Sequence, residues 1–205
     1  MKKNTPFLCW LQLLFMLILP TFIVAQNDLS SGLLLEDEAY DVLPLIEKKD
    51  GSKYPIPFKK NLKMYCPTPG DQGPLGACVA WATGSYALTI SKAIEYNITE
   101  KEKIDSLKLS ASYIFNHIIK NGDCSKGAFL TDGLSFLQKY GTPPATLFNN
   151  SLFDCTARPE SKAIQAALKN RIANFHPIFQ STAKDSIKIE ETKLWIAREK
   201  PVIIG

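Results

Sequence analysis

The middle of the chain carries apolar residues at helical spacing, and this pattern predicts helices before any strand. Residues 77–96 read "ACVAWATGSYALTISKAIEY", a run that predicts a long helix. Its apolar face consists of Val79, Ala82, Tyr86 and Ile90. A second helix is expected at residues 110–120 with Ser110 as its N-cap, and a third at residues 131–140, ending at Gly141.

The C-terminal part of the chain changes pattern. Residues 161–169 predict a short fourth helix, and residues 171–179 ("RIANFHPIF") predict a strand. Residues 186–200 fit a strand tail or a helix, and residues 201–205 ("PVIIG") fit the opening of a buried strand. Because the helices come first and the strands later, we expect an α+β fold rather than an alternating α/β fold.

The first 25 residues have the features of an export signal. Lysines precede the hydrophobic run "LCWLQLLFMLILPTFIVA", which ends on a small residue, Ala25. An uncleaved anchor is the alternative, but Pro20 and the junction at Gln26 favour cleavage. Residues 26–60 predict little structure and are interpreted as a tether or a short pro-segment. Residues 61–205 then form one exported domain, in a compartment that permits disulfides.

Composition and charge fit a globular protein and argue against nucleic acid as a partner. The 205 residues are 45% hydrophobic and 21% charged, which is enough to bury a core. The formal charge is +4, and without Lys2 and Lys3 it is 22 basic against 20 acidic residues, or +2. This excess is too small and too dispersed for nucleic-acid binding. We expect no stable membrane association once the signal is cleaved.

A cysteine follows a Gly/Pro-rich loop at the start of the long helix. The loop at residues 66–76, "CPTPGDQGPLG", holds three prolines and three glycines. In the first helical turn, unpaired N–H groups and the positive end of the helix dipole stabilise a thiolate at Cys78. The amide of Gln72 and the backbone N–H of Cys78 can form an oxyanion hole. The alternatives for Cys78 are a small core residue or half of a disulfide.

The residues around this cysteine are Gln72, Gly73, Gly76, Ala77, Cys78 and Trp81. Together they resemble the nucleophile segment of the papain-like cysteine peptidases, Gln-Gly-x-Cys-Gly-Ser-Cys-Trp-Ala-Phe. The spacing of six from Gln72 to Cys78 is kept. Leu75 stands where most members have a cysteine, and Val79 where they have tryptophan. The first difference implies that one of the family's usual disulfides is absent.

The resemblance continues in the family's order through residues 61–205. The similar segments are "LSASYIFNHI", "GDCSKGAFLTDGLSFLQKYG", "LFNNSLFDC" and "WIAREKPVIIG". It implies the papain-like fold, with the helical half followed by the beginning of the β-rich half. The "PTPGDQG" before the cysteine resembles exported papain-like proteins of bacteria.

The resemblance also implies roles for single residues. Cys78 is the nucleophile and Gln72 the oxyanion donor. Gly127 matches the glycine whose backbone binds an extended peptide by strand addition. Phe129 falls near the wall of the side-chain pocket, and Gly76 borders the same cleft. The implied partner is a peptide or protein substrate, and no cofactor is implied.

Four cysteines remain after the signal: Cys66, Cys78, Cys124 and Cys155. In the family, the cysteine that matches Cys124 bonds to the one replaced here by Leu75. A bridge from Cys124 to Cys155 is therefore the first choice, with Cys66 left as a free thiol or an alternative partner. Clustered Cys-x-x-Cys pairs are absent from the sequence, which argues against a zinc site.

A nucleophilic thiol also needs a paired imidazole and a group that orients it. The two histidines, His117 and His176, lie in a helical and a strand context and are interpreted as structural. In the family the histidine follows the cysteine by about 130–150 residues, which places it just past Gly205. We therefore expect the chain to be truncated. A natural short product or one member of a split pair is the alternative.

The sequence thus predicts an exported papain-like cysteine peptidase whose catalytic His and Asn lie beyond this chain. A non-catalytic papain-like binding or scaffold protein is the second hypothesis, motivated by Leu75 and Val79. A small exported disulfide-bonded domain unrelated to peptidases is the third. Substrate preference and oligomeric state are not encoded in any motif.

Overall fold

The computed structural model describes residues 32–46, 55–119, 121–149 and 154–204. The predicted signal segment at residues 1–25 lies outside them. The elements in chain order are β1 (Leu33–Leu34), α2 (Asp37–Asp41), η1 (Lys63–Tyr65), α3 (Cys78–Ala80), η2 (Trp81–Leu88), α4 (Thr89–Glu95), α5 (Lys101–Ser106), α6 (Ala111–Ile118), β2 (Ala128–Phe129), α7 (Leu130–Lys139), α8 (Ser161–Ala167), η3 (Leu168–Asn170) and α9 (Asp185–Ala197).

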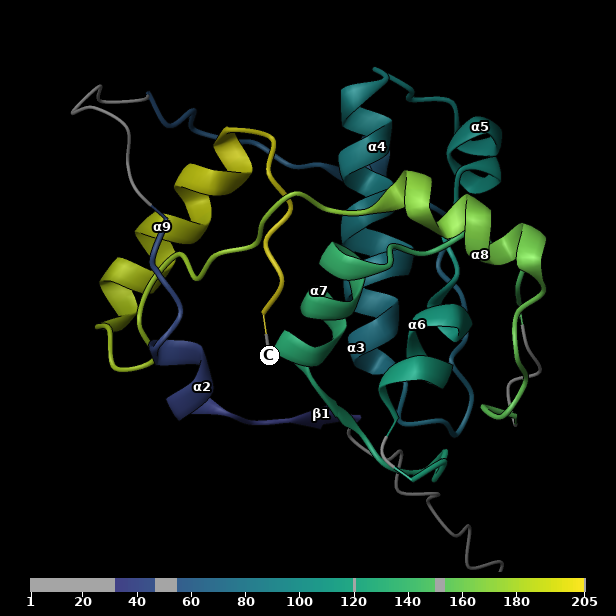
Figure 1. The fold of residues 1–205 in the computed structure, drawn as a ribbon. Coiled ribbons are helices and arrows are strands. Elements are labelled where there is room, and N and C mark those ends of the chain that lie inside the picture. Colours follow the sequence, from purple (N-terminus) through teal and green to yellow (C-terminus); the bar gives the residue numbers. More distant parts are fainter. Residues whose placement is uncertain (1–31, 47–54, 120, 150–153, 205) are drawn as a thin grey trace, which may run out of the picture.

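A central helix runs from Cys78 to Glu95 (Figure 1). It consists of α3, the π-helical η2 and α4, so the long helix predicted at residues 77–96 is confirmed. Helices α6 and α7 pack against its first half. The buried core between them consists of Ala77, Ala80, Ala111, Ile114, Phe115, Leu137 and Cys155.

Helices α6 and α7 also begin and end close to where the sequence predicts. Ser110 is the N-cap of α6, and its hydroxyl accepts a 3.0 Å hydrogen bond from the N–H of Tyr113. This bond satisfies one of the unpaired N–H groups of the first turn. Helix α7 is followed by Gly141 with a φ of +70°, which suits a glycine at a helix end. Both helices are thus encoded by local signals.

The strands predicted in the C-terminal part are wrong. Residues 171–179 have no strand structure, because their backbone groups bond to other segments: Ile172 N–H to Leu137 O, and Pro177 O to Ile46 N–H. Residues 185–197 form helix α9, which confirms the helix among the two alternatives predicted for residues 186–200. Residues 201–204 have no regular secondary structure and pair with no strand among the described residues, and Ile204 is 77% exposed rather than buried.

Part of the segment predicted as a tether lies against the body of the protein. We call residues 32–46 the strap; it contains β1 and α2 (Figure 1). Strand β1 pairs in parallel with β2, with Leu33 opposite Ala128 and Leu34 opposite Phe129. The two strands form the whole of the described sheet, which makes the described part of the chain helix-rich with a small sheet.

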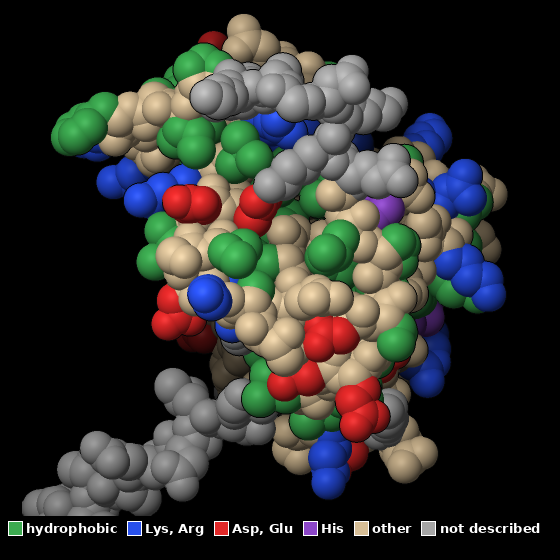
Figure 2. Space-filling view, turned by 90° about the vertical axis from the view of Figure 1, so that its left-hand side faces the viewer, with side chains coloured by type: hydrophobic (Ala, Val, Ile, Leu, Met, Phe, Trp, Pro, Cys, Tyr) green, Lys and Arg blue, Asp and Glu red, His purple; other side chains and the backbone are tan. Residues whose placement is uncertain are grey.

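Helix α9 and the strap border one side of the molecule. Figure 2 shows this side, with carboxylates gathered in its lower part at the level of α2, whose first turn carries Asp37 and Glu38. Hydrophobic side chains are interspersed among them. Within the described ranges, every helix is too short or too polar to cross a membrane.

Candidate active site

Cys78 begins the central helix, directly after the Gly/Pro-rich loop. Its side chain is half-buried, and its thiol is free. Gln72, in the loop, donates a 3.1 Å hydrogen bond from its side-chain amide to the carbonyl of Leu75. An amide group has two N–H donors, so this bond fixes the orientation of Gln72 and leaves its second donor for another acceptor.

The loop that carries Gln72 is held by polar contacts to helix α5 and to Lys108 just after it. The carboxylate of Asp105 accepts 2.6 Å bonds from the N–H and the hydroxyl of Thr68. The ammonium of Lys108 donates to Thr68 O at 3.1 Å and lies 5.2 Å from the ring centre of Trp81. Sequence reasoning missed Asp105 and Lys108, because nothing local to them indicates a contact with a loop almost 40 residues earlier.

Gly76 and Gly127 lie where backbones approach each other closely. A Cβ on Gly76 would come within 2.5 Å of Lys126 O, and a Cβ on Gly127 within 2.5 Å of Gly32 O. No side chain fits at such distances, so both positions require glycine. The loop before Cys78, the edge before β2 and the strap therefore meet at one point beside the thiol.

The strap lies across this point. Ala128 N–H donates a 2.9 Å hydrogen bond to Gly32 O, next to the parallel pairing of β1 with β2. The backbone of Gly32 also lies close enough to Cys78 to lower the pKa of its thiol. The strap thus occupies the backbone edge at Gly127 and Phe129, where sequence reasoning placed an extended peptide substrate.

Side chains of the strap anchor it further along the body. The Glu36 carboxylate accepts hydrogen bonds from the N–H and the hydroxyl of Thr131. The carboxylate of Asp41 accepts from the N–H and the hydroxyl of Ser181. Nothing in the sequence near these acidic residues indicates the contacts, because their partners lie 95 and 140 residues away along the chain.

Burial raises the pKa of the Cys78 thiol above its ordinary value. Backbone hydrogen bonds from Val79, Gly32 and Cys78 itself act in the opposite direction and lower that pKa. The effect of burial is the larger one, so the pKa of Cys78 is raised overall, because removal from water disfavours the charged thiolate. Burial therefore favours the neutral thiol over the thiolate at Cys78.

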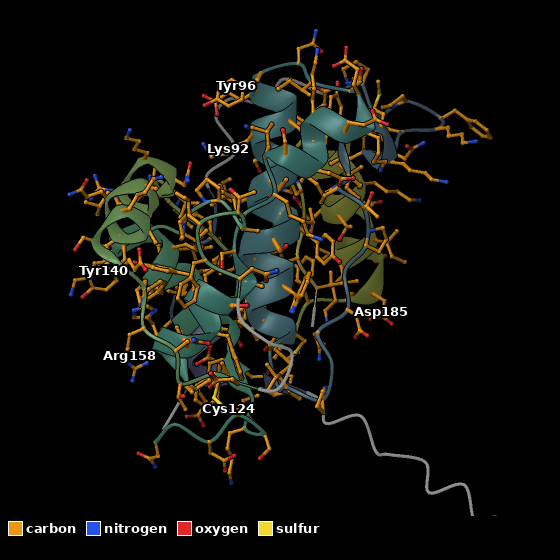
Figure 3. All side chains as sticks on the ribbon, turned by 90° about the vertical axis from the view of Figure 1, so that its right-hand side faces the viewer. Lys92, Tyr96, Cys124, Tyr140, Arg158 and Asp185 are labelled. Atoms are coloured by element: carbon orange, nitrogen blue, oxygen red, sulfur yellow. A yellow bond between two sulfur atoms is a disulfide. The ribbon has the colours of Figure 1, made fainter. Side chains whose placement is uncertain are left out.

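The other three cysteines are arranged as the sequence analysis predicted, with a Cys124–Cys155 bridge and Cys66 outside it. Cys124 and Cys155 form a disulfide with Cα atoms 5.6 Å apart, which confirms that pairing. In Figure 3, Cys124 of this disulfide lies at the opposite end of the molecule from Lys92 of the central helix and from Tyr96, which directly follows that helix. Cys124 O accepts a 3.1 Å bond from Gly76 N–H, so the disulfide loop supports the loop before the nucleophile. Cys66 is a free, half-buried thiol.

The two histidines have partners of their own. His117 Nδ1 lies 2.6 Å from Tyr113 O, and its ring stacks on Phe136 at 5.1 Å between centroids. His176 Nδ1 lies 3.2 Å from Pro44 O of the strap. Within the ranges that the structure describes, no hydrogen bond joins either imidazole to Cys78. The described residues also contain no cluster of His, Cys, Asp or Glu side chains suited to a metal ion.

A cavity of about 340 Å³ opens beyond β2. Its wall is mainly apolar and comes from the central helix, α7, the strap, residues 172–179 and the C-terminal segment. Thr131 and Trp195 belong to this wall. A volume of this order accommodates a ligand group or a few side chains.

The fold is similar to that of a known cysteine protease. The solved structure of xylellain, a cysteine protease from Xylella fastidiosa, superposes with a TM-score of 0.50 and 17% sequence identity. The match covers 80% of this chain and 66% of xylellain, so the chain spans just under two thirds of that protein. No protein-family model matches the sequence, and no curated protein is significantly similar to it.

At this level of identity the likeness shows the fold alone. The described chain therefore has the helix-rich fold of a cysteine protease over most of its length, consistent with the expected α+β class. The roles of Cys78, Gln72, Gly76, Gly127 and Phe129 stay predictions.

Proposed function

We propose that this protein is an exported papain-like cysteine peptidase with Cys78 as its nucleophile. The observation that carries the proposal is the position of Cys78. It is a free thiol at the start of the central helix, beside the glycine-lined edge of Gly76 and Gly127, in a fold shared with a cysteine protease.

In this reaction the Cys78 thiolate attacks the carbonyl carbon of a peptide bond. The oxyanion is stabilised by the Gln72 amide and the backbone N–H of Cys78. The amine half leaves with a proton from an imidazolium, and water then hydrolyses the thioester to release the acid half. The raised pKa of Cys78 means that the thiolate needs this imidazolium beside it. We propose that the His and Asn lie beyond Gly205 in the whole protein.

We also propose that the strap is an inhibitory pro-segment. Its backbone pairs with β2 on the edge that a substrate would use, and the backbone of Gly32 lies beside the Cys78 thiol. The strap must leave this edge before a peptide can bind there. Export through residues 1–25 fits this role, because inhibition would then protect the producing cell.

The test is peptide hydrolysis by the whole protein, with Cys78→Ala as the variant and Cys66→Ser as the matched cysteine control. Cys78→Ala should abolish hydrolysis, and Cys66→Ser should leave it unchanged. Full activity in the Cys78→Ala protein would exclude Cys78 as the nucleophile.

The second candidate is a non-catalytic papain-like binding protein. The occupied cleft and the raised pKa of Cys78 favour it. An assay of peptide binding and hydrolysis by the whole protein, after removal of the strap, distinguishes the two candidates. A peptidase then hydrolyses peptides, whereas a binding protein retains them uncleaved.

A further inference from the structure

The contact between Glu36 and Thr131 joins the strap to the first turn of helix α7. The Glu36 carboxylate accepts a 3.1 Å hydrogen bond from the N–H of Thr131 and a second hydrogen bond from the hydroxyl of the same residue. Both side chains are half-buried, and they lie 95 residues apart in sequence. A carboxylate is thus already bound at this point of the body.

The first turn of α7 needs such a partner. The helix has ten residues, and its N-cap is Phe129, whose ring has no atom that can accept a hydrogen bond. The N–H groups of the first turn have no partner within a helix, and the positive end of the helix dipole favours an anion there. Departure of the strap therefore leaves the N–H and hydroxyl of Thr131 exposed to a new acceptor.

This point adjoins both the proposed peptide edge and the cavity. Thr131 follows β2 by two residues and belongs to the cavity wall. Trp195 belongs to the same wall; it is 8% exposed, and its indole N–H is buried without an acceptor among the described residues. A buried donor of this kind costs stability until an acceptor reaches it. The mainly apolar wall of the cavity favours an occupant that brings apolar side chains.

We propose that Thr131 forms a carboxylate-binding subsite of the peptide cleft, which Glu36 fills while the strap is in place. The occupant after release is a peptide with apolar residues followed by an acidic side chain, as in the strap's own Gly-Leu-Leu-Leu-Glu at residues 32–36. This proposal rests on the proposed role of the strap as a pro-segment. It goes beyond that role by naming the chemistry that the cleft prefers.

Helix α7 also carries a negative charge near the subsite, which disfavours the binding of a carboxylate. Asp132 lies in the same first turn, and its carboxylate repels an incoming acid. The observed binding of Glu36 shows that the hydrogen bonds and the helix end outweigh this repulsion for a chain-linked carboxylate. A free peptide must overcome the same repulsion, so the comparison has to be made with matched acidic and neutral peptides.

The test uses the full chain with Glu36→Gln, which weakens the strap at this contact only. Protection of Cys78 against iodoacetamide is measured by peptide mapping, with added acetyl-Gly-Leu-Leu-Leu-Glu-amide or its glutamine counterpart. The acidic peptide should protect at about tenfold lower concentration, because a hydrogen bond to a charged group exceeds one to a neutral group by roughly this factor. Adding Thr131→Val, which keeps the shape and removes the hydroxyl, should bring the two peptides close to equal.

Ser181→Ala is the matched control, because it removes a hydroxyl that binds another strap carboxylate, Asp41. It should leave the tenfold preference intact. Equal protection by the two peptides, protection by neither, or a preference that survives Thr131→Val would overturn the subsite. None of these outcomes touches the role of Cys78, which hydrolysis by the whole protein tests separately.

Discussion

Gly127 shows how a single residue can control whether the strap lies over Cys78. A Cβ at this position would meet Gly32 O at 2.5 Å, and Gly32 belongs to the strap, which is held by hydrogen bonds and not by the core. Gly127→Ala should therefore displace the strap rather than unfold the body. We expect iodoacetamide to alkylate Cys78 several-fold faster in this variant, measured by peptide mapping.

Gly122→Ala is the control for this change, in the same loop. A Cβ there meets nothing within 4 Å, but Gly122 has a φ of +68°. An L-residue in that region costs about 1 kcal/mol, so this variant loses some stability without touching the strap. If both variants speed alkylation equally, general loosening of the loop and not the strap explains the effect.

At the scale of elements, the Cys124–Cys155 disulfide fixes the loop between α6 and β2. It closes a separation of 31 residues, and a loop of this length contributes about 3–4 kcal/mol by restricting the unfolded chain. Cys124→Ala combined with Cys155→Ala should lower the free energy of unfolding by this amount in urea titrations. Cys66→Ser should change it little, because Cys66 is free.

The variant without the disulfide also tests whether the Cys124–Cys155 bridge supports the loop at residues 66–76, which precedes Cys78. Gly76 N–H donates to Cys124 O, so loss of the disulfide should speed hydrogen exchange at Gly76 well beyond the change in the central helix. A uniform increase along the chain would mean that the disulfide stabilises the fold without holding this loop.

The strap has a second carboxylate contact, and its pH dependence follows from Asp41. The hydroxyl and N–H of Ser181 hold the pKa of Asp41 below its ordinary value. Stability from a lowered pKa is present above the ordinary Asp range and is lost as the pH falls through the lowered value. Acid should therefore loosen the strap, and Cys78 should react faster with dithiodipyridine relative to Cys66 in the same chain.

Asp41→Asn removes the titrating group and should remove this acid response. The nearby cation of Lys188 also lowers the pKa of Asp41. An acid response that persists in Asp41→Asn would show that protonation of Asp41 does not loosen the strap.

These elements also show what the sequence can and cannot predict. Helix α6 was predictable because Ser110 and the apolar spacing lie within the helix itself. The pairing of Leu33 with Ala128 was not predictable, because a strand of two residues is too short to show an alternation of apolar and polar residues. The two residues also lie far apart in the sequence. Residues 171–179 were predicted wrongly, because a strand needs a partner and their backbone groups bond instead to Ile46 and Leu137. The disulfide was predictable only through the family resemblance.

For the whole molecule, the chemistry of Cys78 depends on what lies beside it. In the 205-residue chain, burial holds the pKa of Cys78 above its ordinary value. The alkylation rate of Cys78 should therefore rise with pH through an inflection above that of a free thiol, measured as a pH–rate profile. The imidazolium of the proposed catalytic His would instead move the inflection below the ordinary thiol value.

Gln72→Ala separates the thiolate from the oxyanion hole in the same whole protein. The Gln72 amide is uncharged at every pH, so its loss should leave the alkylation inflection where it was. Hydrolysis should fall by about 10²–10³, the cost of removing one oxyanion donor. An inflection that stays high in the whole protein would show that no imidazolium reaches Cys78. The fold would then carry a cysteine without the base that a peptidase needs, and the binding-protein interpretation would follow.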